Sequence, residues 1–218
     1  MRTHLTAALV ATAVVAAPSA YAAPDPAVPP VSPQARAAGF IDVRSVVPDA
    51  IVDLRYGSAD NFVGAPLYPA GARCLVHESL APGLTTAAAA LAAQGATLVF
   101  WDCYRPHEVQ VRMFEAVPNP AWVARPGPYA RSHESGRSVD VTIARGGRLI
   151  DMGTDFDDFS PHATAYATDG VTAQQQANRA VLRTAMATGG LTVYSGEWWH
   201  FDGPGAGVPR AILDVPVS

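Results

Sequence analysis

Two short polar segments, far apart in the sequence, place the strongest constraint on how this chain can fold. The first runs from Ser132 to Asp140 and includes His133, and the second includes Glu197 and His200. Two imidazoles and one carboxylate are the three protein ligands of many catalytic zinc sites, which keep a fourth position open for water. The second carboxylate could act as a base beside the metal. The sequence therefore predicts a site for one zinc ion, provided that the fold brings the two segments together.

The residues around each segment indicate how these side chains converge. Gly136 allows the backbone to turn tightly after the first histidine, and a strand predicted over Val139–Ile143 returns Asp140 toward the same point. Glu197 and His200 are three residues apart, a spacing at which side chains face opposite sides of a regular strand. We therefore expect a bulge or a bend between them.

Trp198 and Trp199 separate Glu197 from His200 and could form an apolar wall that excludes water from the site. The alternative for either tryptophan is ordinary core packing. Three further histidines lack an acidic residue at comparable spacing, and we expect surface or capping roles for them: His77, His107 and His162.

The N-terminus is typical of a secretory signal peptide. Arg2 precedes an uncharged apolar run over Leu5–Ala17, and Ala20 and Ala22 are the small residues of a cleavage site. The run is short for a membrane span, and the alternative is an N-terminal core helix. We expect residues 1–22 to be the signal peptide, 23–36 a Pro/Ala-rich spacer and 37–218 a single domain that is secreted or extracytoplasmic.

The chain contains two cysteines, Cys74 and Cys103. An even pair in an exported chain favours a disulfide, which by the chain-entropy model stabilises the fold by about 3–4 kcal/mol. Two buried free thiols are the alternative.

The charge balance argues against two classes of partner. The chain has 15 basic and 19 acidic residues, a net charge of −4, and no run of basic residues. We therefore expect neither nucleic acid nor an anionic membrane surface as a partner.

Hydrophobic patterning predicts a mixture of helices and strands. Helices are expected over Leu80–Ala93, from Pro106 to Ala116 and from a cap at Thr172 to Gly189, with strands over Phe40–Val47, Ala50–Leu54, Ala96–Trp101, Val139–Ile143, Leu191–Tyr194 and Glu197–Phe201. The acidic segment from Asp151 to Asp158 shows neither the hydrophobic period of a helix nor that of a strand, and it is expected to be a loop. Because strands and helices do not alternate regularly, we predict an α+β fold with a mostly antiparallel central sheet flanked by helices.

Four motifs follow one another along the chain: Trp101-Asp102-x-Tyr104-Arg105-Pro106, Ser132-His133-x-x-Gly136-x-x-x-Asp140, Asp151-Met152-Gly153-Thr154-x-Phe156-Asp157 and Glu197-Trp198-Trp199-His200. Together they resemble the VanX-type D-alanyl-D-alanine dipeptidases, zinc peptidases with the hedgehog/D,D-peptidase fold. The resemblance extends from Asp53 to His200. It implies that His133, Asp140 and His200 bind zinc and that Glu197 is the general base for a zinc-activated water.

The resemblance also implies that Arg105 stabilises the oxyanion of the tetrahedral intermediate, a role that suits a fixed guanidinium. The alternative for Arg105 is a salt bridge to Asp102 or Glu108.

In this family the acidic loop would supply a carboxylate that holds the free amino group of a dipeptide. Asp157 is the first candidate, and its neighbours Asp155 and Asp158 are alternatives. Tyr56 or Asn61 would line the same pocket.

The chain departs from the family pattern at two positions. The family has a serine two residues before the first histidine ligand, where this chain has Arg131, and an alanine two residues before the aspartate ligand, where this chain has Ser138. Arg131 and the adjacent Ser132 would lie near the carboxylate end of a substrate, and the guanidinium could bind that carboxylate bidentately. The first departure bears on the substrate range and leaves the metal and base positions unchanged.

These features favour a secreted zinc dipeptidase that hydrolyses the cell-wall dipeptide D-Ala-D-Ala. The nearest alternative is a D,D-carboxypeptidase that trims larger peptidoglycan peptides and needs an open cleft in place of a closed amino-end pocket. A non-catalytic zinc-containing binding domain would be expected to lack the base or a ligand, and all four residues are present. A serine hydrolase using Ser132 would need a Gly-x-Ser-x-Gly turn, which does not surround it.

Overall fold

A central mixed sheet organises the computed structural model, which describes residues 28–218. The strand order is β2 (Ile51–Val52), β4 (Thr97–Asp102), β5 (Ser138–Arg145), β8 (His200–Asp202) and β7 (Thr192–Val193), and β6 (Arg148–Leu149) pairs with β5. The pair β2 and β4 runs parallel, and the other pairs in this sheet are antiparallel. The predicted α+β class with a mostly antiparallel sheet is therefore confirmed. The predicted signal peptide lies outside the described residues.

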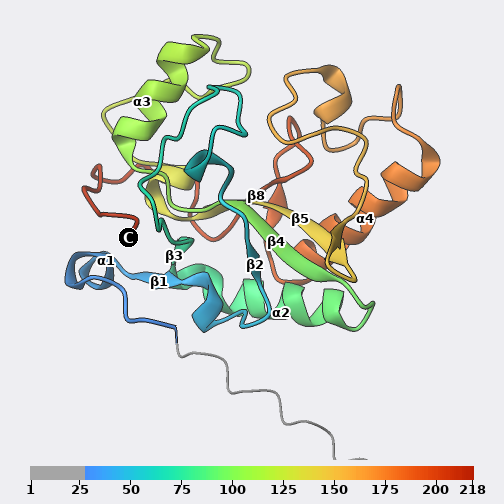
Figure 1. Ribbon diagram of the computed structural model, residues 1–218, viewed down its shortest axis with the longest axis horizontal. Helices are drawn as coiled ribbons and strands as arrows, with labels where there is room; N and C mark the ends of the chain where they lie inside the picture. Colours follow the sequence, from blue (N-terminus) through green and yellow to red (C-terminus); the bar gives the residue numbers. More distant parts are fainter. Residues whose placement is uncertain (1–27) are drawn as a thin grey trace, which may run out of the picture.

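Two long helices cover one face of the sheet, and a third helix with several long loops covers the other. Helix α2 (Ala81–Ala92) runs beneath β2 and β4 and packs against α4 (Ala173–Thr188), while α3 (His107–Ala116) and several long loops lie on the opposite side (Figure 1). The core between helices and sheet is apolar and includes Leu84, Leu91, Phe100, Val141 and Leu182. Each fully buried side chain of this size contributes about 1.5–3 kcal/mol, so the sheet is a rigid support for what lies on its other face.

Helix α4 begins and ends where the sequence indicates. The Thr172 side chain accepts a hydrogen bond from the backbone N–H of Gln175, whose side chain accepts one from the Thr172 N–H. This capping box satisfies two of the donors that a helix N-terminus leaves unpaired. Gly189 follows the last helical residue, as predicted.

The strand predicted over Phe40–Val47 is shorter than expected. Strand β1 (Phe40–Asp42) pairs with β3 (Leu75–His77) in a separate two-stranded sheet, and the 3-10 helix η1 (Val43–Ser45) follows. The Asp42 carboxylate accepts a hydrogen bond from the backbone N–H of Arg44 and caps this helix. A local side-chain contact therefore replaces the extended backbone that the apolar pattern predicted.

Part of the predicted spacer belongs to the folded domain. Helix α1 (Pro33–Ala37) buries Ala35 completely, and the Arg73 guanidinium donates to the carbonyl oxygens of Pro29 and Pro30. Residues from Pro29 onward are therefore attached to the domain. Further 3-10 helices lie in the connecting segments, among them η2 (Arg55–Gly57), η3 (Glu78–Leu80) and η5 (Pro161–Ala163).

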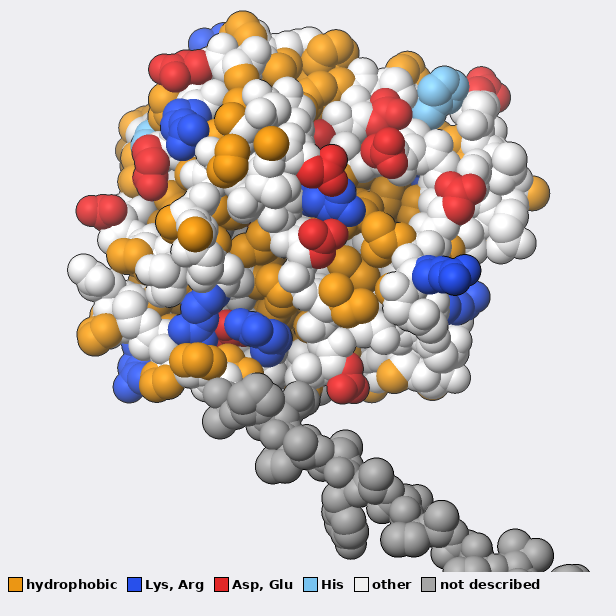
Figure 2. All heavy atoms as spheres, viewed as in Figure 1, with side chains coloured by type: hydrophobic (Ala, Val, Ile, Leu, Met, Phe, Trp, Pro, Cys, Tyr) orange, Lys and Arg blue, Asp and Glu red, His pale blue; other side chains and the backbone are white. Residues whose placement is uncertain are grey.

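Cys74, which precedes β3, and Cys103, which follows β4, form a disulfide with a Cα–Cα distance of 5.2 Å. The predicted bridge is therefore present, and it joins the small sheet to the central one. On the face shown in Figure 2, acidic and arginine side chains are interspersed around a hollow with a hydrophobic floor. Within residues 28–218, no helix has the length and apolar character needed to cross a membrane.

Candidate active site and metal centre

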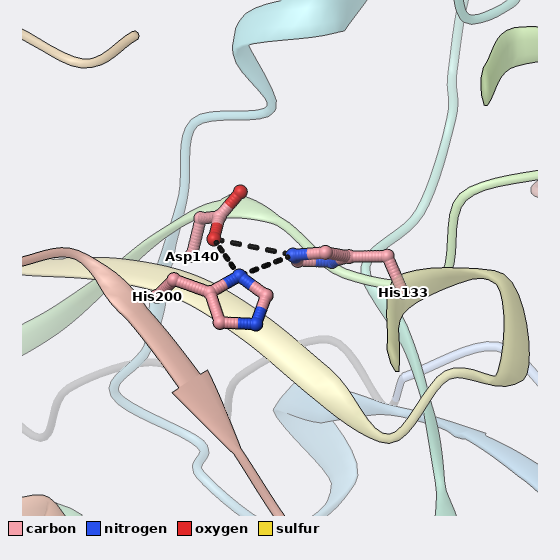
Figure 3. Close-up of side chains that lie close together, drawn as sticks. All are labelled: His133, Asp140 and His200. Atoms are coloured by element: carbon pink, nitrogen blue, oxygen red, sulfur yellow. Dashed lines mark hydrogen bonds and ion pairs between the residues drawn. The ribbon is translucent and has the colours of Figure 1, made fainter. Parts of the chain in front are cut away.

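Three side chains predicted as metal ligands converge from three elements. His133 comes from the 3-10 helix η4 (Ser132–Ser135), Asp140 from β5 and His200 from β8, and their polar atoms point at one another (Figure 3). The register of β5 and β8 places Asp140 directly opposite His200. Gly136 ends η4 at φ +64°, the left-handed backbone that glycine adopts without strain, and turns the chain into β5.

The geometry of these three residues fits a bound zinc ion. His133 Nε2 lies 3.2 Å from Asp140 Oδ1 and 3.0 Å from His200 Nδ1, and His200 Nδ1 lies 3.0 Å from the same carboxylate oxygen. Ligand atoms about 2.0–2.1 Å from a tetrahedral zinc ion are roughly 3.3 Å apart, so these atoms are already close to that arrangement. Two imidazole nitrogens and a carboxylate oxygen are also a donor set that zinc prefers.

Hydrogen bonds and charge prepare this cluster for a cation. His133 donates its Nδ1–H to the Cys103 carbonyl oxygen at 2.8 Å, which leaves Nε2 as the acceptor that faces the cluster. Burial opposes ionisation of Asp140, but His133 and His200 hold the pKa of its carboxyl well below the ordinary value. Burial likewise opposes protonation of His200, but hydrogen bonds to Asp140 and Asp202 raise its pKa to about 10. The site therefore attracts positive charge, whether a proton or a metal ion.

Glu197 lies beside the cluster because the chain bends before β8. Its Oε2 atom is 3.9 Å from His200 Nδ1, and β8 begins at His200 rather than at Glu197 as predicted. The bend expected between these two residues is therefore present. Burial raises the pKa of the Glu197 carboxyl, while His200 opposes that shift. Trp199 lines the same cleft as Glu197, whereas Trp198 packs on Trp101 in the core.

Arg105 is held rigidly next to these three side chains. It forms an ion pair with Asp102 at 2.7 Å, donates to Gln110 Oε1 at 2.8 Å and approaches Asp140 to 3.7 Å. Burial would lower the pKa of this guanidinium, but Asp102 and its other neighbours keep it well above the ordinary value. The salt bridge to Asp102, which the sequence left as an alternative role, therefore also fixes Arg105 in the cleft.

One cleft of about 640 Å³ is lined by the three metal-ligand candidates, by Glu197 and Arg105, and by Asp157 from the acidic loop. Asp155 and Asp158 line a neighbouring cleft instead. Of the three candidate aspartates, Asp157 alone shares a cleft with the metal cluster.

The sequence matches the D-ala-D-ala dipeptidase family over residues 36–218. It is 34% identical to the D-alanyl-D-alanine dipeptidase of Escherichia coli K12, over 80% of this chain and 90% of that protein. It is 31% identical to the D-alanyl-D-alanine dipeptidase of Enterococcus faecium, over 83% of this chain and 98% of that protein. The chain belongs to the D-Ala-D-Ala dipeptidase family. It is therefore an enzyme of the metallopeptidase class, and the resemblance found in its motifs is confirmed.

Tyr56 and Asn61, predicted to line the pocket, do not line the cleft that contains the metal-ligand candidates. The Tyr56 hydroxyl donates to the Asp157 carboxylate at 2.9 Å, and the Tyr56 side chain is buried away from the cleft. Burial raises the pKa of the Tyr56 phenol, so the hydroxyl remains a donor. The Asn61 amide donates to the Ser58 and Ala65 carbonyl oxygens and stabilises its own loop. Tyr56 therefore orients Asp157, and Asn61 has a structural role.

The departure at Arg131 places a guanidinium in the family's cleft. Arg131 is exposed, lines the cleft beside Ser132, and forms no hydrogen bond or ion pair with another described residue. Ser132 has a φ of +46° and its hydroxyl donates to the Ser138 hydroxyl at 2.9 Å. The Arg131 guanidinium is thus available to a ligand, whereas the Ser132 hydroxyl already has a partner.

The structure adds an aromatic row that the sequence did not reveal. The rings of Phe62 and Phe159 are 5.2 Å apart, and Phe159 stacks on Trp122 at 5.1 Å. All three line the cleft, and Trp122 is 46% exposed at its rim. These residues come from three separate loops and share no spacing or motif, so no sequence pattern would have grouped them.

Proposed function

We propose that this enzyme is a secreted, zinc-dependent dipeptidase that hydrolyses D-Ala-D-Ala. One observation carries the proposal: a single cleft contains the three metal-ligand candidates, the Glu197 carboxylate beside them, the fixed Arg105 guanidinium and the separate Asp157 carboxylate. The names of the relatives, each a D-alanyl-D-alanine dipeptidase, support the same substrate.

His133, Asp140 and His200 would hold the ion. When bound, zinc polarises the scissile carbonyl and lowers the pKa of the attacking water. Glu197 takes up the proton of that water and returns it to the leaving amine. Its position 3.9 Å from a ligand nitrogen and its limited exposure support both steps, because a partly buried carboxylate can hold a proton for transfer.

Arg105 stabilises the negative charge that develops on the carbonyl oxygen. Its guanidinium is fixed before substrate arrives, so little reorganisation is needed during the reaction. The ion pair with Asp102 and the hydrogen bond to Gln110 supply that rigidity.

Asp157 binds the free ammonium group of the dipeptide and thereby measures its length from the amino end. Support comes from its place in the cleft and from Tyr56, which orients the carboxylate. Arg131 binds the substrate carboxylate at the other end, with Ser132 next to it. The predicted signal peptide, residues 1–22, supports a location outside the cytoplasm.

The test is hydrolysis of D-Ala-D-Ala by the purified protein, beside its N-acetylated form and the L,L isomer, with and without a chelator. We expect cleavage of the free D,D-dipeptide alone, abolished by the chelator and restored by zinc. Cleavage that persists after removal of all metal would refute the metal-dependent mechanism. Absence of cleavage of the D,D-dipeptide by zinc-loaded protein would refute the substrate.

One observation favours a second candidate, a D,D-carboxypeptidase that trims larger peptides. The cleft volume of about 640 Å³ and the exposed Trp122 at its rim leave room beyond two alanines. Efficient cleavage of the N-acetylated substrate in the same assay would favour this activity, because a blocked amine cannot pair with Asp157.

A further inference from the structure

A second pair of side chains lies next to the two metal ligands on the sheet. In the register of β5 and β8, Asp140 is opposite His200 and Ser138 is opposite Asp202. Residues two apart on a strand face the same side, so both pairs point into the same region. Ser138 is the position where the resembled family has an alanine.

These side chains form a directed set of hydrogen bonds that ends on His200. The Asp202 Oδ1 atom lies 3.2 Å from His200 Nε2 and accepts a hydrogen bond of 2.5 Å from the Ser138 hydroxyl. The Ser138 oxygen in turn accepts one of 2.9 Å from the Ser132 hydroxyl. Ser138 is fully buried, so its hydroxyl cannot exchange this partner for water.

The direction of these bonds fixes the tautomer of the neutral imidazole. An ionised carboxylate only accepts hydrogen bonds, and Ser138 already donates to Asp202. His200 therefore presents an N–H at Nε2, and in the neutral imidazole that a metal ion requires, the Nδ1 lone pair faces His133 and Asp140. A carboxylate behind a ligand histidine fixes its orientation and makes it a more basic ligand.

We infer that Asp202, held by Ser138, is a positioning residue that sets the affinity of this site for a divalent metal ion. The inference rests on the metal site of the proposed function. It assigns a purpose to the second departure from the family pattern, because an alanine at Ser138 could not hold the carboxylate. Loss of such a partner typically lowers metal affinity 10–100-fold.

The competing role for Asp202 is a contact with substrate, because its side chain is 42% exposed and lines the cleft. A substrate contact would change KM and leave the affinity for zinc alone unaltered. Metal affinity therefore separates the two roles without any measurement of turnover.

The experiment is a competition titration of zinc against a chromophoric chelator, with the purified protein and no substrate. Asp202→Ala should weaken zinc binding about 10–100-fold, and Ser138→Ala should weaken it by a smaller factor. Because Ser138 acts through Asp202, adding Ser138→Ala to Asp202→Ala should cause no further loss. Asp155→Asn, which removes an exposed carboxylate of the neighbouring cleft, is the matched control and should not change the affinity.

Absorption of the cobalt-substituted protein gives a second readout, since a reoriented imidazole alters the ligand-field bands. Unchanged zinc affinity in Asp202→Ala would overturn the inference. So would a Ser138→Ala substitution that lowers zinc affinity equally in the wild type and in Asp202→Ala. If Asp202→Ala does not fold, Asp202→Asn replaces it, because the amide still accepts a hydrogen bond without the charge, and an intermediate loss is expected. A wild-type protein that binds no zinc would refute the proposed function itself, which is a distinguishable result.

Discussion

Asp157 combines several features that a binding carboxylate requires. Its backbone has a φ of +57°, an uncommon conformation for a residue other than glycine. Burial raises the pKa of its carboxyl well above the ordinary value, although the hydrogen bond from Tyr56 opposes that shift. An ammonium group that arrives at this carboxylate therefore replaces lost solvation with a charge-assisted hydrogen bond.

We predict that Asp157→Asn lowers kcat/KM for D-Ala-D-Ala by about 10–150-fold, the equivalent of a charge-assisted hydrogen bond of about 1.5–3 kcal/mol. The N-acetylated substrate, which has no ammonium group, should be affected much less. Steady-state kinetics on both substrates measure the change. Asp158→Asn is the matched control in the same loop, outside the metal cleft. A larger loss of kcat/KM in Asp158→Asn than in Asp157→Asn would show that Asp157 is not the residue that binds the ammonium group.

Arg131 is the residue proposed to bind the carboxylate end of the substrate. Arg131→Ser installs the residue that the resembled family has, and we predict a KM for D-Ala-D-Ala that is up to about fivefold higher, because an exposed ion pair contributes only about 0.2–1 kcal/mol. The dipeptide amide, which lacks the carboxylate, should bind equally well to both proteins. Parallel KM measurements on the acid and the amide test this. An equal loss on both substrates would show that Arg131 does not recognise the carboxylate.

Functional residues could be predicted from the sequence where they stand in short motifs, and could not where their role depends on contacts between distant segments. His133, Asp140, Glu197 and His200 stand in short motifs whose residue types and spacing are typical of a zinc site. The role of Tyr56 depends on a contact with a residue about a hundred positions away, and no local pattern contains that contact. The same holds for the aromatic row, where three loops contribute one ring each.

Helix α4 attaches the acidic loop to the domain through Gln175 and Asn178, which donate to Asp151, and through Arg179. Arg179 of α4 is 1% exposed and donates to the carbonyl oxygens of Met152, His162 and Thr164. Among residues 28–218 it forms no ion pair with a carboxylate. One guanidinium nitrogen, Nη2, is buried without a partner, so the loss of a further carbonyl contact would add to a cost that the side chain already carries. The loop that carries Asp157 is therefore held at both ends by this side chain.

We predict that Arg179→Met lowers the free energy of unfolding by about 1–3 kcal/mol and raises the KM for D-Ala-D-Ala, because the loop loses one of its attachments to α4. Chemical denaturation and steady-state kinetics measure the two effects. Arg183→Met is the control one helical turn away, since Arg183 reaches only the Ala165 carbonyl oxygen beyond the loop. A variant with reduced stability and an unchanged KM would separate Arg179 from the position of Asp157.

The two long helices meet at a pair of glycines. A Cβ atom on Gly83 would lie 2.4 Å from the Gly189 carbonyl oxygen, closer than any real contact. Gly83→Ala should therefore cost about 1–3 kcal/mol of stability, the usual range for overpacking. Thermal unfolding measures it, with Gly207→Ala as the control, because nothing lies within 4 Å of a Cβ there. Equal melting temperatures for both variants would contradict the close helix contact.

Element boundaries followed the sequence where a cap or a glycine marks them and departed from it elsewhere. The start of α4 at the Thr172 cap was predictable, because the capping box is contained in four residues. The early end of β1 was not, because Asp42 prefers its hydrogen bond to Arg44 over the extended backbone that the apolar pattern favours. Strand β8 began later than predicted because Glu197 and His200 both face the metal cluster, which a regular strand does not allow.

Across the whole molecule, the disulfide and two backbone contacts join the small sheet to the metal centre. Cys103 carries the bridge to Cys74 and supplies the carbonyl oxygen that holds His133 Nδ1. The next two residues continue the connection, because Tyr104 N–H donates to the Leu75 carbonyl oxygen and Arg105 N–H to that of His133. A change at Cys103 is therefore expected to shift His133 and Arg105 together.

The bridge should accordingly affect both stability and metal binding. Replacing both residues, Cys74→Ser with Cys103→Ser, should lower the free energy of unfolding by about 3–4 kcal/mol for a loop of this length. It should also weaken zinc binding, because the carbonyl that orients His133 loses its anchor. Denaturation with and without zinc and chelator competition measure the two effects, and a reducing agent should destabilise the wild type but not the variant. Because the chain-entropy contribution acts on the unfolded state, a lower stability with unchanged zinc affinity would mean that the bridge restricts the unfolded chain only. A loss of both would show that it also maintains the geometry of the metal centre.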